Sequence, residues 1–126
     1  MKYLVIFLGS GTGGVLRFLI GTAVQRLANG WLFPVGTFFV NMAGCLVIGL
    51  LAQLSESRGV FQGNTRLLLF TGLLGGFTTF SSFGYETFQL LRDGEYLLGA
   101  ANASLQIVLG LVSVWLGYTI GRLIAG

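Results

Sequence analysis

Four long apolar stretches dominate this chain of 126 residues and leave few folds open to it. They lie at about residues 3–23, 35–54, 67–91 and 96–124, and each has the ~20 residues that a helix needs to cross the hydrocarbon core of a bilayer. Only 9% of the residues are charged, against about 25% in a typical soluble domain. We therefore predict an all-α, multi-pass membrane protein with one four-helix transmembrane domain over residues 1–126. The short loops make neighbouring helices antiparallel.

The positive charges predict only a weak preference for one orientation in the membrane. Four spans place both termini on one side, and that side carries four basic residues: Lys2, Arg58, Arg66 and Arg122. The other side carries Arg26 and Arg92, with Arg17 inside the first span nearer that face. Because the positive-inside rule orients a chain by such a difference, a nearly unbiased chain can insert both ways. Two interpretations stay open from charge alone: an antiparallel, dual-topology homodimer, and one fixed orientation with both termini in the cytoplasm.

The third stretch is interrupted by the sequence Gly-Gly-Phe-Thr-Thr-Phe-Ser-Ser-Phe-Gly at residues 75–84. Two adjacent glycines and four hydroxyl residues make a poor helix and a poor lipid-facing surface. Irregular backbone at membrane depth is tolerated only where it is buried in protein or lines a watery path. We predict that the third helix is broken near Gly75–Thr79 and that the break builds an ion site. The alternative is a kink padded with small residues for packing.

Three polar side chains fall inside the first two stretches. Arg17 is the only cation well inside a span, where it can attract an anion, snorkel to the near interface or tie two subunits together. We expect one of its structural roles. Thr37 and Asn41 are one turn apart and share a helix face. Their hydroxyl and amide donors can hold an anion without a full positive charge, or Asn41 can join helices by a hydrogen bond.

Polar residues also mark the third and fourth stretches. Glu86, near the end of the third span, can be a proton-titratable coupling group, a member of a pore mouth or an interfacial residue that does little. In the fourth span Asn102, Gln106 and Gly110 follow at every fourth position, and Ser113 lies close to that face. This polar stripe suits a water-filled path better than a lipid-facing surface.

Two phenylalanines, Phe80 and Phe83, come to one face if a new half-helix starts at Thr78 or Thr79. The edge of an aromatic ring is positive, so both rings can touch an anion there. Packed or lipid-facing phenylalanine is much commoner, and spacing alone favours that role.

The composition argues against catalysis and against nucleic-acid binding. The chain has no His and a single cysteine, Cys45, so it offers no nucleophile–base pair and no Cys/His metal site. No pair of carboxylates lies at mid-membrane. The net charge of +3 is scattered over positions that flank the membrane, which is not the basic patch that nucleic acids require. We predict that the protein is not an enzyme and binds no nucleic acid.

Three motifs, in this order, resemble the Fluc-type (CrcB) family of fluoride channels. They are Gly-Gly-Val-Leu-Arg at residues 13–17, Gly-Thr-Phe-Phe-Val-Asn-Met-Ala-Gly at 36–44 and Gly-Leu-Leu-Gly-Gly-Phe-Thr-Thr-Phe-Ser-Ser-Phe at 72–83. The third motif is the most specific, and the resemblance covers the whole chain. It implies a channel that exports fluoride passively across the bacterial inner membrane, as an antiparallel, dual-topology homodimer with two fluoride pathways.

The resemblance also implies roles for individual residues. Phe80 and Phe83 match the family's pore phenylalanines, which reverses the expectation from spacing alone. Asn41 matches the family's pore asparagine. The backbone carbonyls of Gly75 and Thr78 match a structural sodium site that both subunits build at the dimer interface.

The implied ion path includes further polar residues, which are Thr37, Ser81, Glu86, Gln106 and Ser113. The fourth span departs here from the family, whose fourth helix carries a track of Tyr, Ser and Thr hydroxyls. In this chain amides form the comparable face, with Ser113 as the only nearby hydroxyl.

Two other functions stay open. A small, dual-topology, proton-coupled exporter would use Glu86 as its coupling group. Such exporters usually carry a mid-membrane carboxylate, commonly in the first helix, where this chain has no acid. The other function is that of a non-transporting membrane subunit held by glycine-packed helices. It would not explain the interruption of the third span.

Overall fold

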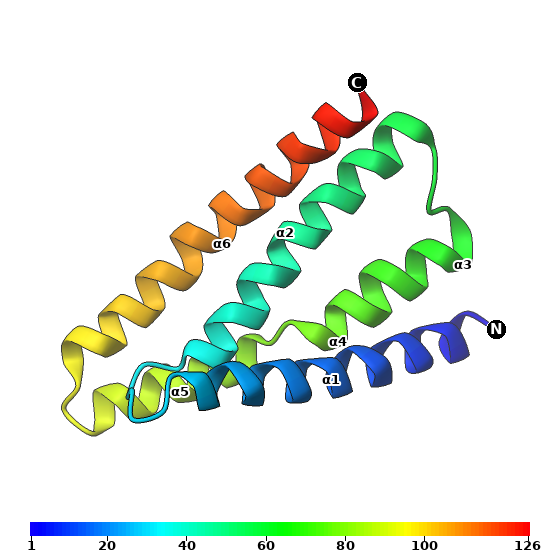
Figure 1. Cartoon of the computed structure of the whole chain (residues 1–126). Coiled ribbons are helices and arrows are strands. Elements are labelled where there is room, and N and C mark those ends of the chain that lie inside the picture. The colour runs from blue at the N-terminus through cyan, green and yellow to red at the C-terminus, as the bar shows by residue number, and fades with distance from the viewer.

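The computed structural model describes residues Met1 to Gly126 and is all-helical, without strands (Figure 1). Four segments are long and apolar enough to cross a membrane, as predicted: Lys2–Leu27, Val35–Arg58, Gly63–Arg92 and Tyr96–Ala125. The first, second and fourth segments are the single helices α1, α2 and α6. The third consists of α3 (Gly63–Arg66), the π-helix η1 (Leu67–Leu74), α4 (Gly75–Phe77) and α5 (Phe80–Arg92).

The helices extend beyond the apolar stretches at several ends. α1 continues to Leu27 rather than residue 23, and α2 continues to Arg58 rather than residue 54. Apolar content marks the part of a helix inside the hydrocarbon, whereas backbone hydrogen bonds continue the helix into the polar interface. α2 ends at Arg58, before Gly59, whose φ of 66° is left-handed and whose N–H donates to the Ser55 carbonyl at 3.1 Å. Glycine takes this conformation without steric penalty and so stops the helix.

The π-helix η1 has no counterpart in the sequence-based prediction. The Gly75 N–H at its end reaches the carbonyl of Phe70, five residues earlier, as π-helical bonding requires. Such turns are rare in proteins and are frequent at functional sites. The eight residues of η1 are almost all apolar, so neither periodicity nor turn residues distinguish α from π winding here.

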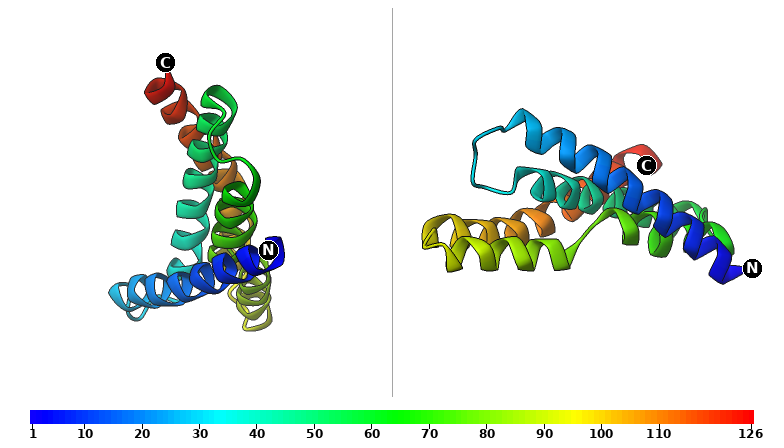
Figure 2. Two further views of the ribbon diagram at one scale, coloured as in Figure 1. Left: turned by 90° about the vertical axis from the view of Figure 1, so that its right-hand side faces the viewer. Right: turned by 90° about the horizontal axis from the view of Figure 1, so that it is seen from below.

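The helices form two pairs that diverge toward the chain ends (Figures 1 and 2). α2 packs along α6, and α1 packs along η1 and α4. Glycines allow the backbones within each pair to approach closely. A side chain added at Gly13 would collide with the backbone of Leu73, and one added at Gly117 would collide with the backbone of Leu46.

The third segment changes its neighbour along its length. Its first part, η1 and α4, lies against α1, whereas α5 packs against α6. The two residues between α4 and α5, Thr78 and Thr79, therefore lie where the two helix pairs meet.

One copy of the chain buries little of its apolar surface. Only three hydrophobic side chains are buried, namely Val40, Leu74 and Leu90, and large apolar residues face outward along the helices. Exposed apolar surface of this extent is unfavourable in water and marks contact with lipid or with another protein. The buried polar residues are Ser55, Thr79, Asn102 and Gln106.

Candidate functional site

Two extended residues separate α4 from α5. Thr78 has φ −87° and ψ 157°, and Thr79 has φ −147° and ψ 119°. Thr79 then begins α5 as its N-cap, because its Oγ1 accepts a hydrogen bond from the Ser82 N–H at 3.1 Å. A threonine in this place satisfies one of the free N–H groups at a helix start, so the second helix can begin inside the membrane.

Side chains take the donors that two backbone carbonyls would otherwise use. In a continuous α-helix the Gly75 carbonyl would accept from the Thr79 N–H, but that N–H donates to Asn41 Oδ1 at 2.8 Å. The Thr78 carbonyl would accept from the Ser82 N–H, which donates to Thr79 Oγ1 instead. Both carbonyls are thus deprived of their helical partners. Backbone oxygens in this state are available to a cation or to water.

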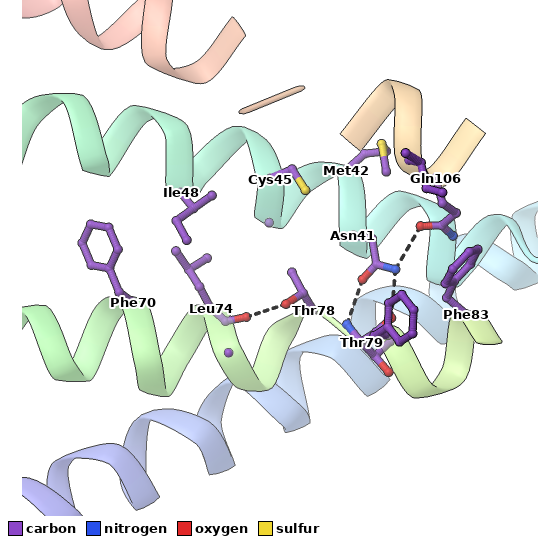
Figure 3. A pocket seen from close by; sticks show the side chains of 14 residues that line it. Asn41, Met42, Cys45, Ile48, Phe70, Leu74, Thr78, Thr79, Phe83 and Gln106 are labelled. Atoms are coloured by element: carbon purple, nitrogen blue, oxygen red, sulfur yellow. Dashed lines mark hydrogen bonds between the residues drawn. The ribbon is translucent and has the colours of Figure 1, made fainter. Parts of the chain in front are cut away.

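The Asn41 side chain joins α2 to the interruption and to α6. Its Nδ2 donates to the Thr79 carbonyl at 3.1 Å and to Gln106 Oε1 at 3.1 Å (Figure 3). Together with the bond from the Thr79 N–H, these contacts use the amide oxygen and the amide nitrogen of Asn41. The sequence-based alternative for Asn41, a bond between helices, is therefore observed, and it lies at the same place as the candidate ion site.

Hydrogen bonds continue from Gln106 along α6 and back to α5. Gln106 Nε2 lies 3.5 Å from Asn102 Oδ1, and Asn102 Nδ2 donates to Thr87 Oγ1 at 2.8 Å. Asn102 has no exposed surface. Buried amides need partners for both their oxygen and their nitrogen, and this arrangement supplies them. The sequence analysis named Asn102 and Gln106 as part of a polar stripe, but it did not name Thr87, whose bond to Asn102 joins residues 15 positions apart.

Phe80 and Phe83 pack edge to face beside Asn41. Their ring centroids are 5.4 Å apart with an angle of 65° between the planes, and Phe80 is 82% exposed. Both rings line a pocket of about 380 Å³ that is open on one side of the molecule. The predicted residues that share this pocket are Asn41, Gly75, Thr78, Phe80, Phe83 and Gln106.

A second, more polar pocket of about 290 Å³ contains Arg17, Thr37 and Glu86. The Thr37 hydroxyl donates to Glu86 Oε1 at 2.7 Å. Arg17 Nε and Glu86 Oε2 are both buried and have no hydrogen-bond partner in the protein. Thr79 lines this pocket as well as the first, so the interruption separates two pockets of different character.

Two predicted pathway residues lie outside this arrangement or at its margin. Ser113 lines neither pocket, and its hydroxyl points to Met42 Sδ at 3.7 Å. Ser81 is exposed, with its Oγ 3.4 Å from Thr79 Oγ1.

The chain contains no group of three or more His, Cys, Asp or Glu side chains that could hold a metal ion. The Gly75 and Thr78 carbonyls are hard oxygen donors of the kind that suit Na⁺, and their helical N–H partners are occupied elsewhere. These residues fit such an ion.

Comparison with known proteins identifies close relatives over nearly the full length of the chain. Residues 4–118 match the sequence model of the family described as "CrcB-like protein, Camphor Resistance (CrcB)". A "Fluoride-specific ion channel FluC" from Methylobacillus flagellatus is 47% identical over 122 residues, which cover 97% of this chain and 95% of that protein. Proteins with the same description from Solibacter usitatus and Chloroflexus aurantiacus are 45% and 47% identical, and each match covers at least 97% of both chains.

Proposed function

Because the chain belongs to the CrcB family, we propose that it is a fluoride-selective channel that lets the anion leave the cell passively across the bacterial inner membrane. It is a multi-pass membrane protein with four spans, and it is not an enzyme. The observation that carries the proposal is the shared pocket of Phe80, Phe83 and Asn41 beside an interrupted helix.

The donors around this pocket suit a small, strongly hydrated anion. Fluoride gives up water only where several donors approach it closely. The positive edges of Phe80 and Phe83 and the amide of Asn41 supply such donors without a full positive charge that would trap the ion. A larger halide would fit poorly among groups that are fixed by the helix start at Thr79. Ser81, Thr37 and Glu86 extend the path toward the second pocket, and Gln106 and Ser113 extend it along α6.

A second, antiparallel copy is the partner that we propose for the exposed face. Phe80 is 82% exposed although it belongs to the pathway, and a channel lined on one side only would open to lipid. The nearly even charge balance permits both orientations. The single interface between two such copies would then complete two fluoride pathways, related by the two-fold axis of the dimer. Arg17 would face the protein interior near this pathway.

Sodium is the cation that we propose for the Gly75 and Thr78 carbonyls. One copy offers two oxygens, so two copies related by a two-fold axis would offer four. The ion would act structurally, by satisfying carbonyls that have lost their helical donors and by making the dimer centre less repulsive to anions.

A proton-coupled exporter built on Glu86 is not favoured. Glu86 lies beside Thr37 and in a pocket with Arg17, rather than in a wide substrate cavity. The relatives that cover nearly the whole chain are described as channels.

Efflux of fluoride from liposomes that contain the purified protein tests the proposal. We expect rapid fluoride release at a fluoride electrode and no chloride release at a chloride electrode. Phe80→Ile and Phe83→Ile should each lower fluoride flux at least about tenfold, which corresponds to ~1.4 kcal/mol of lost ring-edge interaction, while the dimer still elutes as the wild type does. Unchanged flux in both variants would remove the phenylalanines from the pathway. A folded wild-type dimer that releases no fluoride would refute the channel itself.

A further inference from the structure

We propose that Thr87 and Asn102 are positioning residues that orient the amide of Asn41 through Gln106. These four residues form a chain of side-chain hydrogen bonds from α2 through α6 to α5, which we call the amide relay. The inference rests on the proposed role of Asn41 in the fluoride pathway, and it adds two residues, Thr87 and Asn102, that line neither pocket.

Every member of the amide relay donates to the next. Asn41 Nδ2 donates to Gln106 Oε1 at 3.1 Å, Gln106 Nε2 to Asn102 Oδ1 at 3.5 Å, and Asn102 Nδ2 to Thr87 Oγ1 at 2.8 Å. The Thr87 hydroxyl donates to the Phe83 carbonyl, with 2.7 Å between the two oxygens. Hydrogen bonds that run in one direction polarise and strengthen one another, and the bond between Gln106 and Asn102 is the longest and weakest link.

Backbone groups fix the direction of the relay at both ends. The Thr79 N–H can only donate, so Asn41 must turn its Oδ1 toward it and its Nδ2 toward Gln106. The Phe83 carbonyl can only accept, so the Thr87 hydroxyl uses its proton there and presents a lone pair to Asn102. If an amide between these ends flipped, two donors or two acceptors would face each other. Such a mismatch is unfavourable for side chains as buried as Asn102 and Gln106.

The relay bears on the ion because both acceptors of the Asn41 amide nitrogen are protein oxygens. They are the Thr79 carbonyl and Gln106 Oε1. An anion that binds at this nitrogen must replace one of them. The Thr79 oxygen belongs to the backbone, whereas Gln106 Oε1 is on a side chain and can turn away. In this inference Gln106 Oε1 accepts from Asn41 when no ion is bound and turns away when fluoride binds. Asn102 and Thr87 then guide the Gln106 side chain back to Asn41 after the ion leaves.

Thr87→Val tests the relay, because valine keeps the shape of threonine and removes the acceptor for Asn102. The full-length dimer is labelled with ¹⁵N-asparagine, which reports the four residues Asn29, Asn41, Asn64 and Asn102. We expect the side-chain NH₂ signals of Asn102 and Asn41 to shift together in Thr87→Val, with Asn29 and Asn64 as unchanged references. Thr87→Ser should leave all four signals near their wild-type positions. A shift of Asn102 without one of Asn41, or of neither, would overturn the relay.

Fluoride efflux measures the consequence for transport. We expect Thr87→Val to lower the flux about tenfold, the effect of about one lost buried hydrogen bond, and to change the fluoride concentration that gives half-maximal flux. Thr87→Ser should keep the flux and the half-maximal fluoride concentration near their wild-type values. Thr12→Val is the matched control, because the Thr12 hydroxyl makes the same bond to a carbonyl four residues earlier but is exposed. If Thr87→Val does not assemble, Thr87→Cys gives the same comparison through its weaker sulfur acceptor.

The two measurements separate this inference from the proposed function. A wild-type dimer that does not release fluoride would refute the channel, while the asparagine signals would still decide whether the relay exists. Wild-type flux in Thr87→Val, despite a shifted Asn41 signal, would overturn the role of the relay in transport.

Discussion

Asn41 performs two tasks with one side chain. Its oxygen accepts the Thr79 N–H and so withdraws that donor from the Gly75 carbonyl. Its nitrogen faces Gln106 at the edge of the phenylalanine pocket. The first task concerns the proposed cation, and the second concerns the proposed anion. A substitution that alters only the nitrogen can therefore separate the two sites.

Asn41→Asp keeps the acceptor oxygen and replaces the amide donor by a second oxygen that carries negative charge when ionised. We expect fluoride flux to fall at least about tenfold, since an acceptor now faces Gln106 Oε1 and the ion meets a carboxylate in place of an N–H donor. The stabilisation of the dimer by sodium should persist, because the Thr79 N–H still has its acceptor. Thermal unfolding in sodium and in a large organic cation, together with efflux, measures both effects.

Asn41→Leu is the comparison for this experiment, because it removes the acceptor as well as the donor. We expect it to lose both the flux and the sodium dependence of stability. If Asn41→Asp lost the sodium dependence as completely as Asn41→Leu does, the separation of the two tasks would be wrong.

Residue chemistry alone drew attention to Asn41 and the hydroxyl-rich interruption, because polar groups at membrane depth usually face protein or water rather than lipid, but it left the role of Asn41 open. It did not identify the acceptor of each amide. The bonds of Asn41 to Thr79 and of Asn102 to Thr87 join helices whose relative rotation is set by tertiary packing. The role of Phe80 was also ambiguous from spacing, since a ring on one face of a half-helix can meet lipid, protein or an ion.

At the scale of elements, apolar content predicted the four spans because the bilayer imposes a fixed length on each helix. It could not predict the ends of α1 and α2, which depend on backbone bonding in the polar interface and on caps such as Gly59. Apolar content also could not predict that η1 is a π-helix rather than an α-helix. The structure places several glycines, among them Gly13 and Gly117, at the contacts between helices.

Gly117→Ala tests whether the close approach of α2 and α6 stabilises the fold. A methyl group there would collide with the Leu46 carbonyl, so the helices must separate. We expect the free energy of unfolding to fall by ~1–3 kcal/mol, as for other overpacked sites, in reversible unfolding of the protein in detergent micelles. Gly11→Ala is the control, because no heavy atom lies within 4 Å of the added methyl group. A similar loss in Gly11→Ala would show that helix contact is not the cause.

At the scale of the whole molecule, we expect sodium to stabilise the proposed dimer. It would bind the Gly75 and Thr78 carbonyls, which lack their helical donors in each chain. We expect the midpoint of thermal unfolding of the dimer to fall when sodium is replaced by N-methylglucamine at constant fluoride and ionic strength. The ligand linkage relation gives a loss of ~2.7 kcal/mol if sodium is present at 100 times its dissociation constant. An unfolding midpoint that does not respond to this exchange would argue against the site.

Dual topology is the prediction that concerns the molecule most broadly, because an antiparallel dimer requires chains of both orientations in one membrane. Gln62→Cys in a Cys45→Ser background places the only thiol in the exposed turn between α2 and α3. An impermeant maleimide added to intact cells should label about half of the chains, since the charge difference between the two sides is small. Permeabilised cells should label fully.

Adding basic residues to one loop should shift the labelled fraction toward one extreme and lower fluoride flux together with it, because uniformly oriented chains cannot form antiparallel pairs. Complete labelling or complete protection of the unbiased chain, with normal flux, would show that the functional assembly has a single orientation.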